Sequence, residues 1–471
     1  MNRFLAIDLG AESGRAILGT LDAGQLTLEE LHRFPNTPVR LPTGLYWDVL
    51  RLFHEIRHAL SICGRERKIA LDGIGVDTWG VDFALLGSDG ALLDNPRHYR
   101  DSRNNGMPEK TFAVVPREEI FAETGIQFMQ INSLYQLHAM KLSGSPALGV
   151  AHKLLFMPDL FNYWLTGQQR AEVSIASTSQ FYNPAAGQWA NGLFRRLGLP
   201  ESVLPEIVPS GTRLGTLLDE IAESAGLPGD VPVYATAGHD TASAVAAVPA
   251  EGGDWCYISS GTWSLMGVEL DTPVIDDRSL ALNFTNEVGA GGKIRLLKNI
   301  AGLWVLQECR RAWALAGREY SYEELSKLAA EAEPARMLID PDAFQEPGRM
   351  PERISEYCRT QGREAPDQPG GMARMILESL AATYAKVLDS LEKLLGRRLN
   401  RVHIVGGGSR NRLLNQLAAN ALGRIVVAGP AEATAAGNVL VQAMGAGVVS
   451  GSAEAREIVR RSFPLQTFQP G

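Results

Sequence analysis

The chain has 471 residues, of which 45% are hydrophobic and 21% charged, a globular composition that excludes disordered, collagen-like and coiled-coil architectures. Its 45 Lys and Arg stand against 53 Asp and Glu, and the formal charge of −8 argues against a nucleic-acid partner, because such proteins usually carry a basic face. The length has room for two large domains or for about three of ordinary size.

The same composition bears on location. No run of about 18 uncharged apolar residues occurs, so we expect no membrane span. The apolar run at the amino terminus is too short for a signal peptide. The four cysteines form no CxxC pair, so we expect reduced thiols in a cytoplasmic protein.

The first half of the chain opens with a strand–turn–strand pattern. Residues 4–7 are an apolar run typical of a buried strand, residues 8–15 form a turn, and residues 16–21 predict the return strand. Apolar residues recur at helical spacing over 47–63, and residues 69–76 predict a further strand.

The middle of the chain, over about 116–209, is mixed and mostly helical in pattern. A strand over 231–237 then precedes a helix of small residues, and 255–268 repeat the strand–turn–strand pattern. One such unit in each half suggests an internal duplication. We therefore expect an α/β protein with two domains, 1–245 and 246–471.

Beyond Asn299 the pattern is helical. Proline and glycine residues over 347–371 predict a loop, and a long helix is expected over 372–395. Residues 401–405 predict a strand, which a glycine turn joins to a helix over 411–422.

The turn at 8–15 has the composition of a phosphate-binding loop. Small residues let backbone N–H groups approach phosphate oxygens, and Ser13 adds a hydroxyl donor. Asp8 ends the strand, where an acid could hold the water ligands of Mg²⁺, and Arg15 could neutralise phosphoryl charge. The other interpretation is an ordinary hairpin turn. Residues 259–262 form a second turn of the same kind.

Asp240 lies between a strand and the amino terminus of a helix. An acid there is often only a helix cap, which stabilises the helix by roughly 1 kcal/mol. It could also accept a hydroxyl proton during phosphoryl transfer. We expect the helix end to lower the pKa of Asp240. His239, beside it, could bond a sugar hydroxyl.

Two other motifs point to different functions. His54, Glu55 and His58 match the HExxH pattern of zinc proteases, but no third ligand follows at the metzincin spacing, so a solvated helix face is the better interpretation. No P-loop pattern occurs, and the glycines at 406–408 lack the third glycine and the acid of a dinucleotide fingerprint.

Together these segments resemble the FGGY family of carbohydrate kinases, within the sugar kinase/actin/Hsp70-like superfamily. The resemblance spans nearly the whole chain, in the order 8–15, 77–83, 99–103, 238–243, 259–267, 297–300 with 302–304, and 403–408. It implies a duplicated ribonuclease H-like fold with ATP and sugar in the cleft between two domains that close.

More narrowly, the 77–83 and 259–267 segments are similar to those of family members that phosphorylate L-rhamnulose. This resemblance implies transfer of phosphate from ATP, with Mg²⁺, to the C1 hydroxyl, with Asp240 accepting the hydroxyl proton. Ala11 is common in that subfamily, whereas the resemblance gives the acidic side chain of Glu12, close to the phosphates, no role of its own.

The resemblance also assigns residues to ligands. Those implied to bind the ATP phosphates are Ala11, Glu12, Ser13, Gly14, Arg15 and Thr262. Those implied to contact ATP elsewhere are Gly407, on the adenine side, and Gln307. Those implied to contact the sugar are Gly80, His239, Asp240, Thr241 and Asn299, while Asp8 would lie near the metal.

Three alternatives remain open at this stage. An actin-like or Hsp70-like ATPase would share the phosphate turns without a sugar-facing Asp240. A kinase of L-fuculose or L-xylulose would share the chemistry and differ in hydroxyl recognition. A zinc hydrolase would need His54 and His58 to bind metal. The sequence does not determine the oligomeric state, for which a monomer is the starting expectation.

Overall fold

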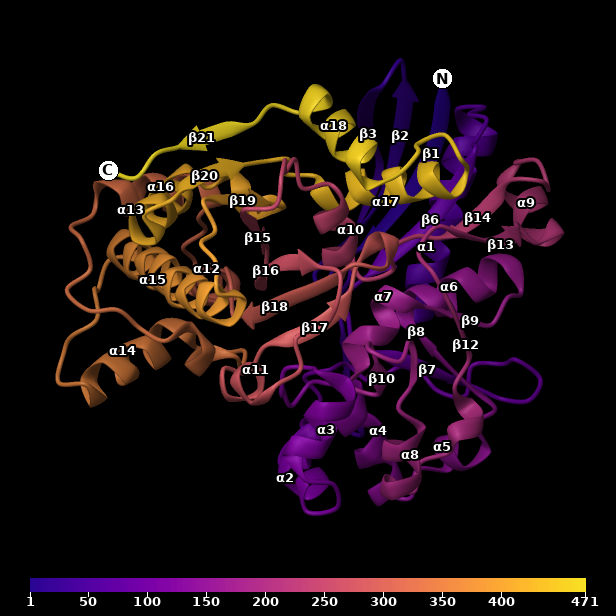
Figure 1. The fold of residues 1–471 in the computed structure, drawn as a ribbon, viewed down its shortest axis with the longest axis horizontal. Helices are drawn as coiled ribbons and strands as arrows, with labels where there is room; N and C mark the ends of the chain where they lie inside the picture. Colours follow the sequence, from indigo (N-terminus) through magenta and orange to yellow (C-terminus); the bar gives the residue numbers. More distant parts are fainter. The chain divides into compact units, whose positions relative to one another are not determined.

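The computed structural model describes residues 1–471, which divide into two compact units (Figure 1). The first unit comprises Met1–Ala247, Glu269–Leu296 and Ala433–Ser462. The second comprises Val248–Val268, Leu297–Glu432 and Phe463–Gly471. Each unit is therefore assembled from segments that are distant in the sequence.

A six-stranded sheet forms the centre of the first unit, in the order β13-β14-β6-β1-β2-β3. Strand β1 is antiparallel to β2 and parallel to β6, which is itself parallel to β14. All of β6 is buried, as expected for a central strand covered on both faces. The strands are β1 (Asn2–Leu9), β2 (Ser13–Asp22), β3 (Gln25–Pro35), β6 (Gly73–Thr78), β13 (Thr212–Thr216) and β14 (Pro232–Ala235).

Helices cover this sheet through apolar faces. In α1 (Val49–Ser61), the side chains of Leu52, Ile56 and Leu60 are buried at helical spacing. Helix α17 (Ala433–Gly445) packs on β1 and β6 and against α10 (Asp240–Ala246). A Cβ at Gly437 would lie 1.7 Å from the Ser243 carbonyl oxygen, so only glycine permits this close helix packing.

The rest of the first unit includes a second hydrophobic core around Phe156 and Phe181. Its remaining elements are β4 (Val39–Leu41), β5 (Gly44–Tyr46), β7 (Phe83–Leu86), α2 (Met107–Phe112), α3 (Arg117–Thr124), α4 (Ser133–Leu142), α5 (Pro146–Val150), β8 (Lys153–Phe156), α6 (Met157–Thr166), β9 (Arg170–Glu172), α7 (Val173–Ala176), β10 (Tyr182–Asn183), β11 (Gln188–Trp189), α8 (Asn191–Leu197), β12 (Glu206–Val208), α9 (Asp219–Ala225), α11 (Asp277–Ala281), β17 (Thr285–Val288) and α18 (Ser452–Ser462).

The second unit repeats this strand arrangement. Strand β15 is antiparallel to β16 and parallel to β19, and β19 is parallel to β20. The same pattern joins β1 to β2, β6 and β14, which is the duplication that the sequence suggested. The strands are β15 (Trp255–Ser260), β16 (Ser264–Leu270), β19 (Arg401–Val405), β20 (Ile425–Ala428) and β21 (Gln466–Phe468), and β18 (Ile294–Ile300) runs across the division at Leu296.

One expected loop is wrong. The proline- and glycine-rich stretch 347–371 contains helix α14 (Met350–Thr360). Pro351 lies in the first turn, where its missing N–H costs nothing, and Met350, Ile354 and Cys358 form a buried face. The other helices of this unit are α12 (Trp304–Leu315), α13 (Tyr322–Glu331), α15 (Pro369–Leu395) and α16 (Arg412–Leu422).

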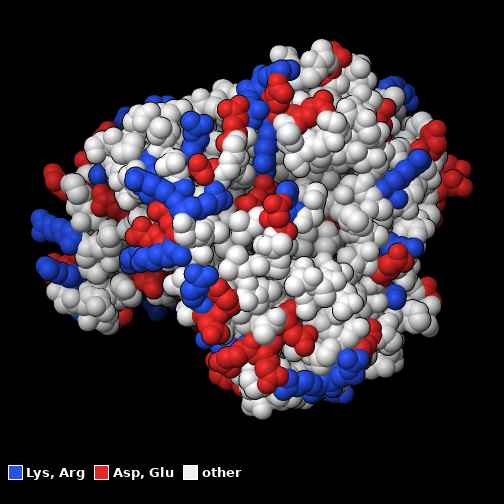
Figure 2. Space-filling model, viewed as in Figure 1, with Lys and Arg blue, Asp and Glu red and all other residues white.

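The surface follows from the composition. Figure 2 shows Lys and Arg interspersed with Asp and Glu over the face in view. All four cysteines are buried free thiols. No helix combines the length and the apolar character needed to cross a membrane.

Candidate active site

The first expected phosphate-binding turn joins β1 to β2, and Asn36, which lies outside the turn, holds it through hydrogen bonds. The Gly10 N–H donates to the Ser13 carbonyl (3.0 Å), and Asn36 donates its side-chain amide to the Gly10 carbonyl (2.8 Å) and its backbone N–H to the Glu12 carbonyl (3.0 Å). The turn geometry therefore depends on Asn36. Sequence reasoning missed this residue, because it follows β3 and carries no motif.

The carboxylate of Asp8 lies at the end of β1, opposite Arg15 in the sheet register. Arg15 Nη2 donates to Asp8 Oδ2, so the two residues form a partly buried ion pair. On the other side, β6 places Asp77 beside Asp8. Two acidic residues thus end neighbouring strands of one sheet.

Asp77 is a functional candidate that the sequence analysis did not assign. Its side chain is fully buried, Oδ2 accepts a hydrogen bond from Asn438 (2.5 Å), and Oδ1 has no hydrogen-bond partner. Burial and the nearby charge of Asp8 raise the pKa of Asp77 well above its usual range. Its signal in the sequence was its place at the start of the 77–83 stretch, one of the segments that carry the family resemblance.

Asp240 is the first residue of α10, and the strand contact from the Thr78 N–H to the Gly238 carbonyl (2.8 Å) brings it to the same end of the sheet. The Thr241 hydroxyl donates to Asp240 Oδ1 (3.1 Å), and 31% of the Asp240 side chain is exposed. Burial, with a contribution from the Asp8 charge, raises the pKa of Asp240 despite the opposing effect of His239.

The expectation that the helix end would lower the pKa of Asp240 is therefore wrong. Helix α10 has only seven residues, so its dipole is small. Loss of hydration and repulsion from a second carboxylate outweigh it.

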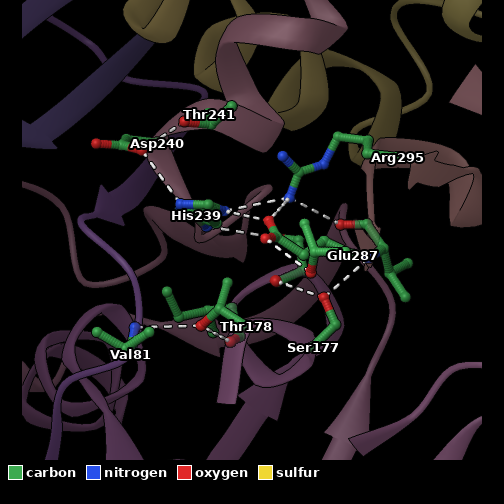
Figure 3. Close-up of polar contacts among 12 residues, drawn as sticks. Val81, Ser177, Thr178, His239, Asp240, Thr241, Glu287 and Arg295 are labelled. Atoms are coloured by element: carbon green, nitrogen blue, oxygen red, sulfur yellow. Dashed lines mark hydrogen bonds and ion pairs between the residues drawn. The ribbon is translucent and has the colours of Figure 1, made fainter. Parts of the chain in front are cut away.

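His239 connects Asp240 to a buried ion pair (Figure 3). Its Nε2 lies 3.5 Å from Asp240 Oδ1, while Nδ1 lies 3.3 Å from Glu287 Oε2 and 3.1 Å from Arg295 Nη2. Glu287 and Arg295 bond each other at 3.0 Å. Neither was singled out by the sequence, which shows them only as one acid and one base in β17 and β18.

Gly80 lies against His239. A Cβ at Gly80 would be 3.4 Å from His239 Nε2 and from the Thr178 side chain, which is ordinary contact distance. The next residue, Val81, has a φ of 69°, which is strained for a β-branched side chain, and its N–H donates to Thr178 Oγ1 (3.1 Å; Figure 3). The structure thus brings Gly80, His239, Asp240 and Thr241 together in the first unit.

In the second unit, the turn between β15 and β16 carries Thr262 and is held by the start of α12. The Trp304 N–H donates to the Thr262 carbonyl (3.0 Å), and the Leu303 N–H to the Gly261 carbonyl (3.1 Å). Gly302 has a φ of 51°, and a Cβ there would lie 2.4 Å from the Trp263 backbone. Glycine is therefore required at 302 to seat this turn.

The remaining expected ATP and sugar residues of this unit lie close by in the chain. Gln307 is in the first turn of α12, and its side-chain oxygen is buried without a hydrogen-bond partner. Asn299 lies in β18, three residues before Gly302. Both are thus attached to the segment that holds Thr262.

The glycine turn after β19 packs on the β15 end. A Cβ at Gly408 would lie 2.0 Å from Ser260 Oγ, and one at Gly406, where φ is 82°, would lie 3.0 Å from the Ser260 carbonyl oxygen. At Gly407 a Cβ would meet nothing within 4 Å. Two of these glycines are therefore needed for packing, and the structure of the chain does not require the third.

This contrast yields a matched pair of predictions. We expect Gly408→Ala to lower the melting temperature, because the methyl group must displace Ser260. Gly407→Ala should change the free energy of unfolding by no more than about 0.5 kcal/mol in either direction, as is usual for surface substitutions, and so leave the melting temperature unchanged. It should raise the KM for ATP if the adenine ring lies on this glycine. Thermal unfolding and ATP titration measure both. Equal melting temperatures for the two variants would contradict the assignment.

The HExxH motif has a structural explanation. Glu55 bonds His32 Nε2 (2.7 Å) and Arg51 (3.2 Å), and His54 and His58 are exposed. The structure contains no group of three or more His, Cys, Asp or Glu side chains arranged to hold a metal ion. The solvated helix face expected from the sequence is what α1 presents.

Comparisons with known proteins agree with this architecture. The sequence models of the FGGY family of carbohydrate kinases match residues 3–247 (N-terminal domain) and 256–446 (C-terminal domain). A rhamnulokinase of Bacteroides thetaiotaomicron is 48% identical over 469 residues, covering 99% of this chain and 96% of the relative. A rhamnulokinase of Enterobacter sp. is 41% identical, covering 99% and 94%.

Solved structures are similar in fold. The xylulose kinase of Lactobacillus acidophilus superposes with a TM-score of 0.80 at 16% identity, covering 100% of this chain and 94% of that one. At this identity the likeness concerns the two-domain fold and not the substrate.

Proposed function

Because this chain belongs to the FGGY family of carbohydrate kinases, we propose that it transfers the γ-phosphoryl group of ATP to the C1 hydroxyl of L-rhamnulose. The products are L-rhamnulose 1-phosphate and ADP, in the breakdown of L-rhamnose. The observation that carries the substrate is the 48% identity to a rhamnulokinase over 99% of the chain. A likeness of this extent covers every segment on which the expected site residues lie.

Asp240 is assigned as the general base. It would accept the C1 hydroxyl proton as that oxygen attacks phosphorus. The raised pKa of Asp240 makes it a stronger base than an ordinary aspartate, which favours this role. Gly80, His239, Thr241 and Asn299 would contact the sugar.

The ATP-binding residues are proposed from both halves of the chain. The 1–245 domain would supply Ala11, Glu12, Ser13, Gly14 and Arg15 to the phosphates. The 246–471 domain would supply Thr262 to the phosphates, with Gln307 and Gly407 on the nucleoside. The tethered turns at 10–13 and 261–263 support this assignment, because fixed backbone donors bind phosphate without reorganising.

Mg²⁺ is proposed to accompany ATP. Mg²⁺ takes one or two protein carboxylates with waters and phosphate oxygens, and the neighbouring Asp8 and Asp77, with Asp77 Oδ1 unpartnered, fit that requirement. When bound, the ion would neutralise phosphate charge. Asp8 would hold it through water, and Arg15 would keep Asp8 in place.

We further propose that the protein works in the cytoplasm as a monomer, without nucleic-acid or membrane partners. The four buried free thiols support the cytoplasmic location, and the mixed charge on the face in Figure 2 gives that face no basic surface for a nucleic acid. Size-exclusion chromatography with light scattering would test the oligomeric state.

ADP release with Mg-ATP tests the proposed function. The panel is L-rhamnulose, L-fuculose, L-xylulose, L-ribulose, D-xylulose, glycerol and no sugar. We expect the highest kcat/KM with L-rhamnulose. A preference for L-fuculose or L-xylulose would support the kinase activity and contradict L-rhamnulose as the substrate. Equal rates with and without sugar would contradict the kinase and leave an ATPase.

A further inference from the structure

We propose that Arg295 and Glu287 are positioning residues that keep a proton on Nε2 of His239, facing Asp240 and the sugar. This inference rests on the proposed function, because it concerns the same site. The pair acts from behind the histidine and does not reach the substrate: Arg295 is 0% exposed and Glu287 is 4% exposed.

The argument begins with donors and acceptors at Nδ1 of His239. A guanidinium has no acceptor and stays protonated, so the 3.1 Å approach of Arg295 Nη2 is favourable only if the Nδ1 lone pair accepts from it. A neutral imidazole carries one ring proton. Glu287 Oε2, 3.3 Å from Nδ1, would favour a proton there, but the closer guanidinium N–H at 3.1 Å opposes one. We therefore place the proton on Nε2, on the opposite side of the ring.

The environment of Nε2 agrees with this tautomer. Asp240 Oδ1 lies 3.5 Å from Nε2, and an N–H there faces an acceptor where a bare nitrogen would face a like lone pair. A Cβ built at Gly80 would lie 3.4 Å from the same Nε2, so this N–H borders the space left by the missing side chain. A sugar hydroxyl placed there can accept from His239 and donate to Asp240.

Glu287 keeps Arg295 in place. Its Oε2 accepts from Nη2 (3.0 Å), and its negative charge balances the guanidinium in a site without water access. Burial raises the pKa of Glu287, but the Arg295 charge is the largest of the opposing causes, and the net shift of the pKa is downward. Glu287 therefore remains ionised beside Arg295 at neutral pH.

The pair is arranged at a cost to stability. All hydrogen bonds of the Arg295 guanidinium are made by Nη2, to Glu287, to His239 and to the Val288 carbonyl (3.4 Å), while Nε and Nη1 are buried without partners. Unpartnered buried donors are rare and destabilising. Such exceptions concentrate at functional sites, which favours a role in the reaction over one in folding alone.

The first test is spectroscopic and needs no substrate. In protein labelled with ¹⁵N-histidine, long-range proton–nitrogen correlations show which ring nitrogen carries the proton, and the loss of one signal set in His239→Asn assigns His239. We expect an Nε2–H ring in the natural protein. In Arg295→Met we expect the proton to move to Nδ1, because Glu287 is then the only partner there.

The second test is kinetic. In Arg295→Met we expect kcat to fall about 10- to 100-fold, the usual cost of removing a partner that orients an active-site histidine at metal centres, with a small change in the KM for ATP. Arg295→Lys, which retains a charged donor, should recover part of the loss. Arg456→Met is the control, because it removes an arginine from a different partly buried ion pair of the same unit, Arg456–Glu269.

The outcomes separate the inference from the proposed function. An Nδ1–H ring in the natural protein, or an unchanged tautomer and kcat in Arg295→Met, would overturn the positioning role even if L-rhamnulose is phosphorylated. A different preferred sugar with the expected tautomer would overturn the substrate only. If Arg295→Met does not fold, the proton–nitrogen spectra of the natural protein and of Arg295→Lys still show which ring nitrogen of His239 carries the proton.

Discussion

Replacing Asp240 with Asn should reduce kcat for sugar phosphorylation by about 10²- to 10⁴-fold, the usual contribution of a general base. The carboxamide keeps the size of the side chain and an acceptor for the Thr241 hydroxyl, so the site geometry should survive. What is lost is the group that takes up the hydroxyl proton. Steady-state ADP release with L-rhamnulose measures the effect.

Stability separates this loss from misfolding. The folded-state pKa of Asp240 is raised, so ionising it costs folding free energy at neutral pH, and Asp240→Asn removes that cost. We expect an unchanged or higher melting temperature. Asp276→Asn is the matched control: Asp276 caps α11, where Asn is an equally good cap, and its kcat should not change. A kcat for Asp240→Asn within threefold of the natural protein would exclude Asp240 as the base.

The pH dependence of kcat/KM in the natural protein should also show that Asp240 acts as the base. The base acts in its ionised form, so kcat/KM should fall as pH drops through the raised pKa of Asp240, above the usual aspartate value of about 3.9. Besides burial, the Asp8 charge raises the pKa of both Asp77 and Asp240, and the Asp240 charge raises that of Asp77, so the midpoint does not belong to Asp240 alone. A fall in kcat/KM only at or below about pH 4 would contradict a raised pKa of Asp240.

The sequence predicted those parts of the fold that depend on local pattern. The strand–turn–strand units at β1–β2 and β15–β16, helix α1 and the strand–helix pair β14–α10 each lie where hydrophobic spacing and turn residues placed them. Helix α14 does not follow from local pattern, because proline and glycine usually interrupt a helix, whereas proline in the first turn is compatible with one.

The candidate site residues that the sequence suggests lie in or beside turns. Asp8, Gly80 and Asp240 stand at strand ends, where function is concentrated in such sheets. Asn36, Glu287 and Arg295 come from segments with no motif, and only tertiary contacts bring them to the site. The direction of the Asp240 pKa shift could not be predicted for the same reason, because the causes that raise this pKa are burial and a carboxylate 232 positions earlier in the chain.

Replacing Asp82 with Ala should lower the free energy of unfolding by about 3–5 kcal/mol, the cost of removing one partner from a buried charged network. Asp82 is fully buried. Its Oδ2 accepts from Trp47 Nε1 (2.5 Å), Trp79 Nε1 (3.0 Å) and the Tyr99 N–H (3.2 Å), and its Oδ1 accepts from Gln136 (2.8 Å). Alanine would leave three buried donors unpaired, since the Gln136 amide still donates to the Ile131 carbonyl (3.0 Å). Denaturant unfolding measures the loss.

Asp82→Asn is the graded control. Its carboxamide oxygen can still accept from the indoles, so the loss should be smaller, and its pH dependence should differ. Burial raises the pKa of Asp82 to about 6 although its hydrogen bonds lower it. The unfolded value is about 3.9, so the natural protein takes up a proton on folding between these values, and the Asp82 contribution to unfolding free energy falls as pH rises through them. Asn removes this fall.

The same replacement should reach the sugar site, because Asp82 closes the turn that carries Gly80. Trp79 precedes Gly80, its ring packs on Trp47 at 4.1 Å between centroids, and the Asp82 N–H donates to the Gly80 carbonyl (3.0 Å). The left-handed Val81 is held between these anchors. Asp82→Ala keeps the backbone hydrogen bond to Gly80 but removes the carboxylate that holds the Trp79 indole (3.0 Å), so we expect the strain at Val81 to relax and Gly80 to move away from His239. We therefore expect Asp82→Ala to raise the KM for L-rhamnulose more than the KM for ATP. An equal rise in both would indicate general unfolding instead.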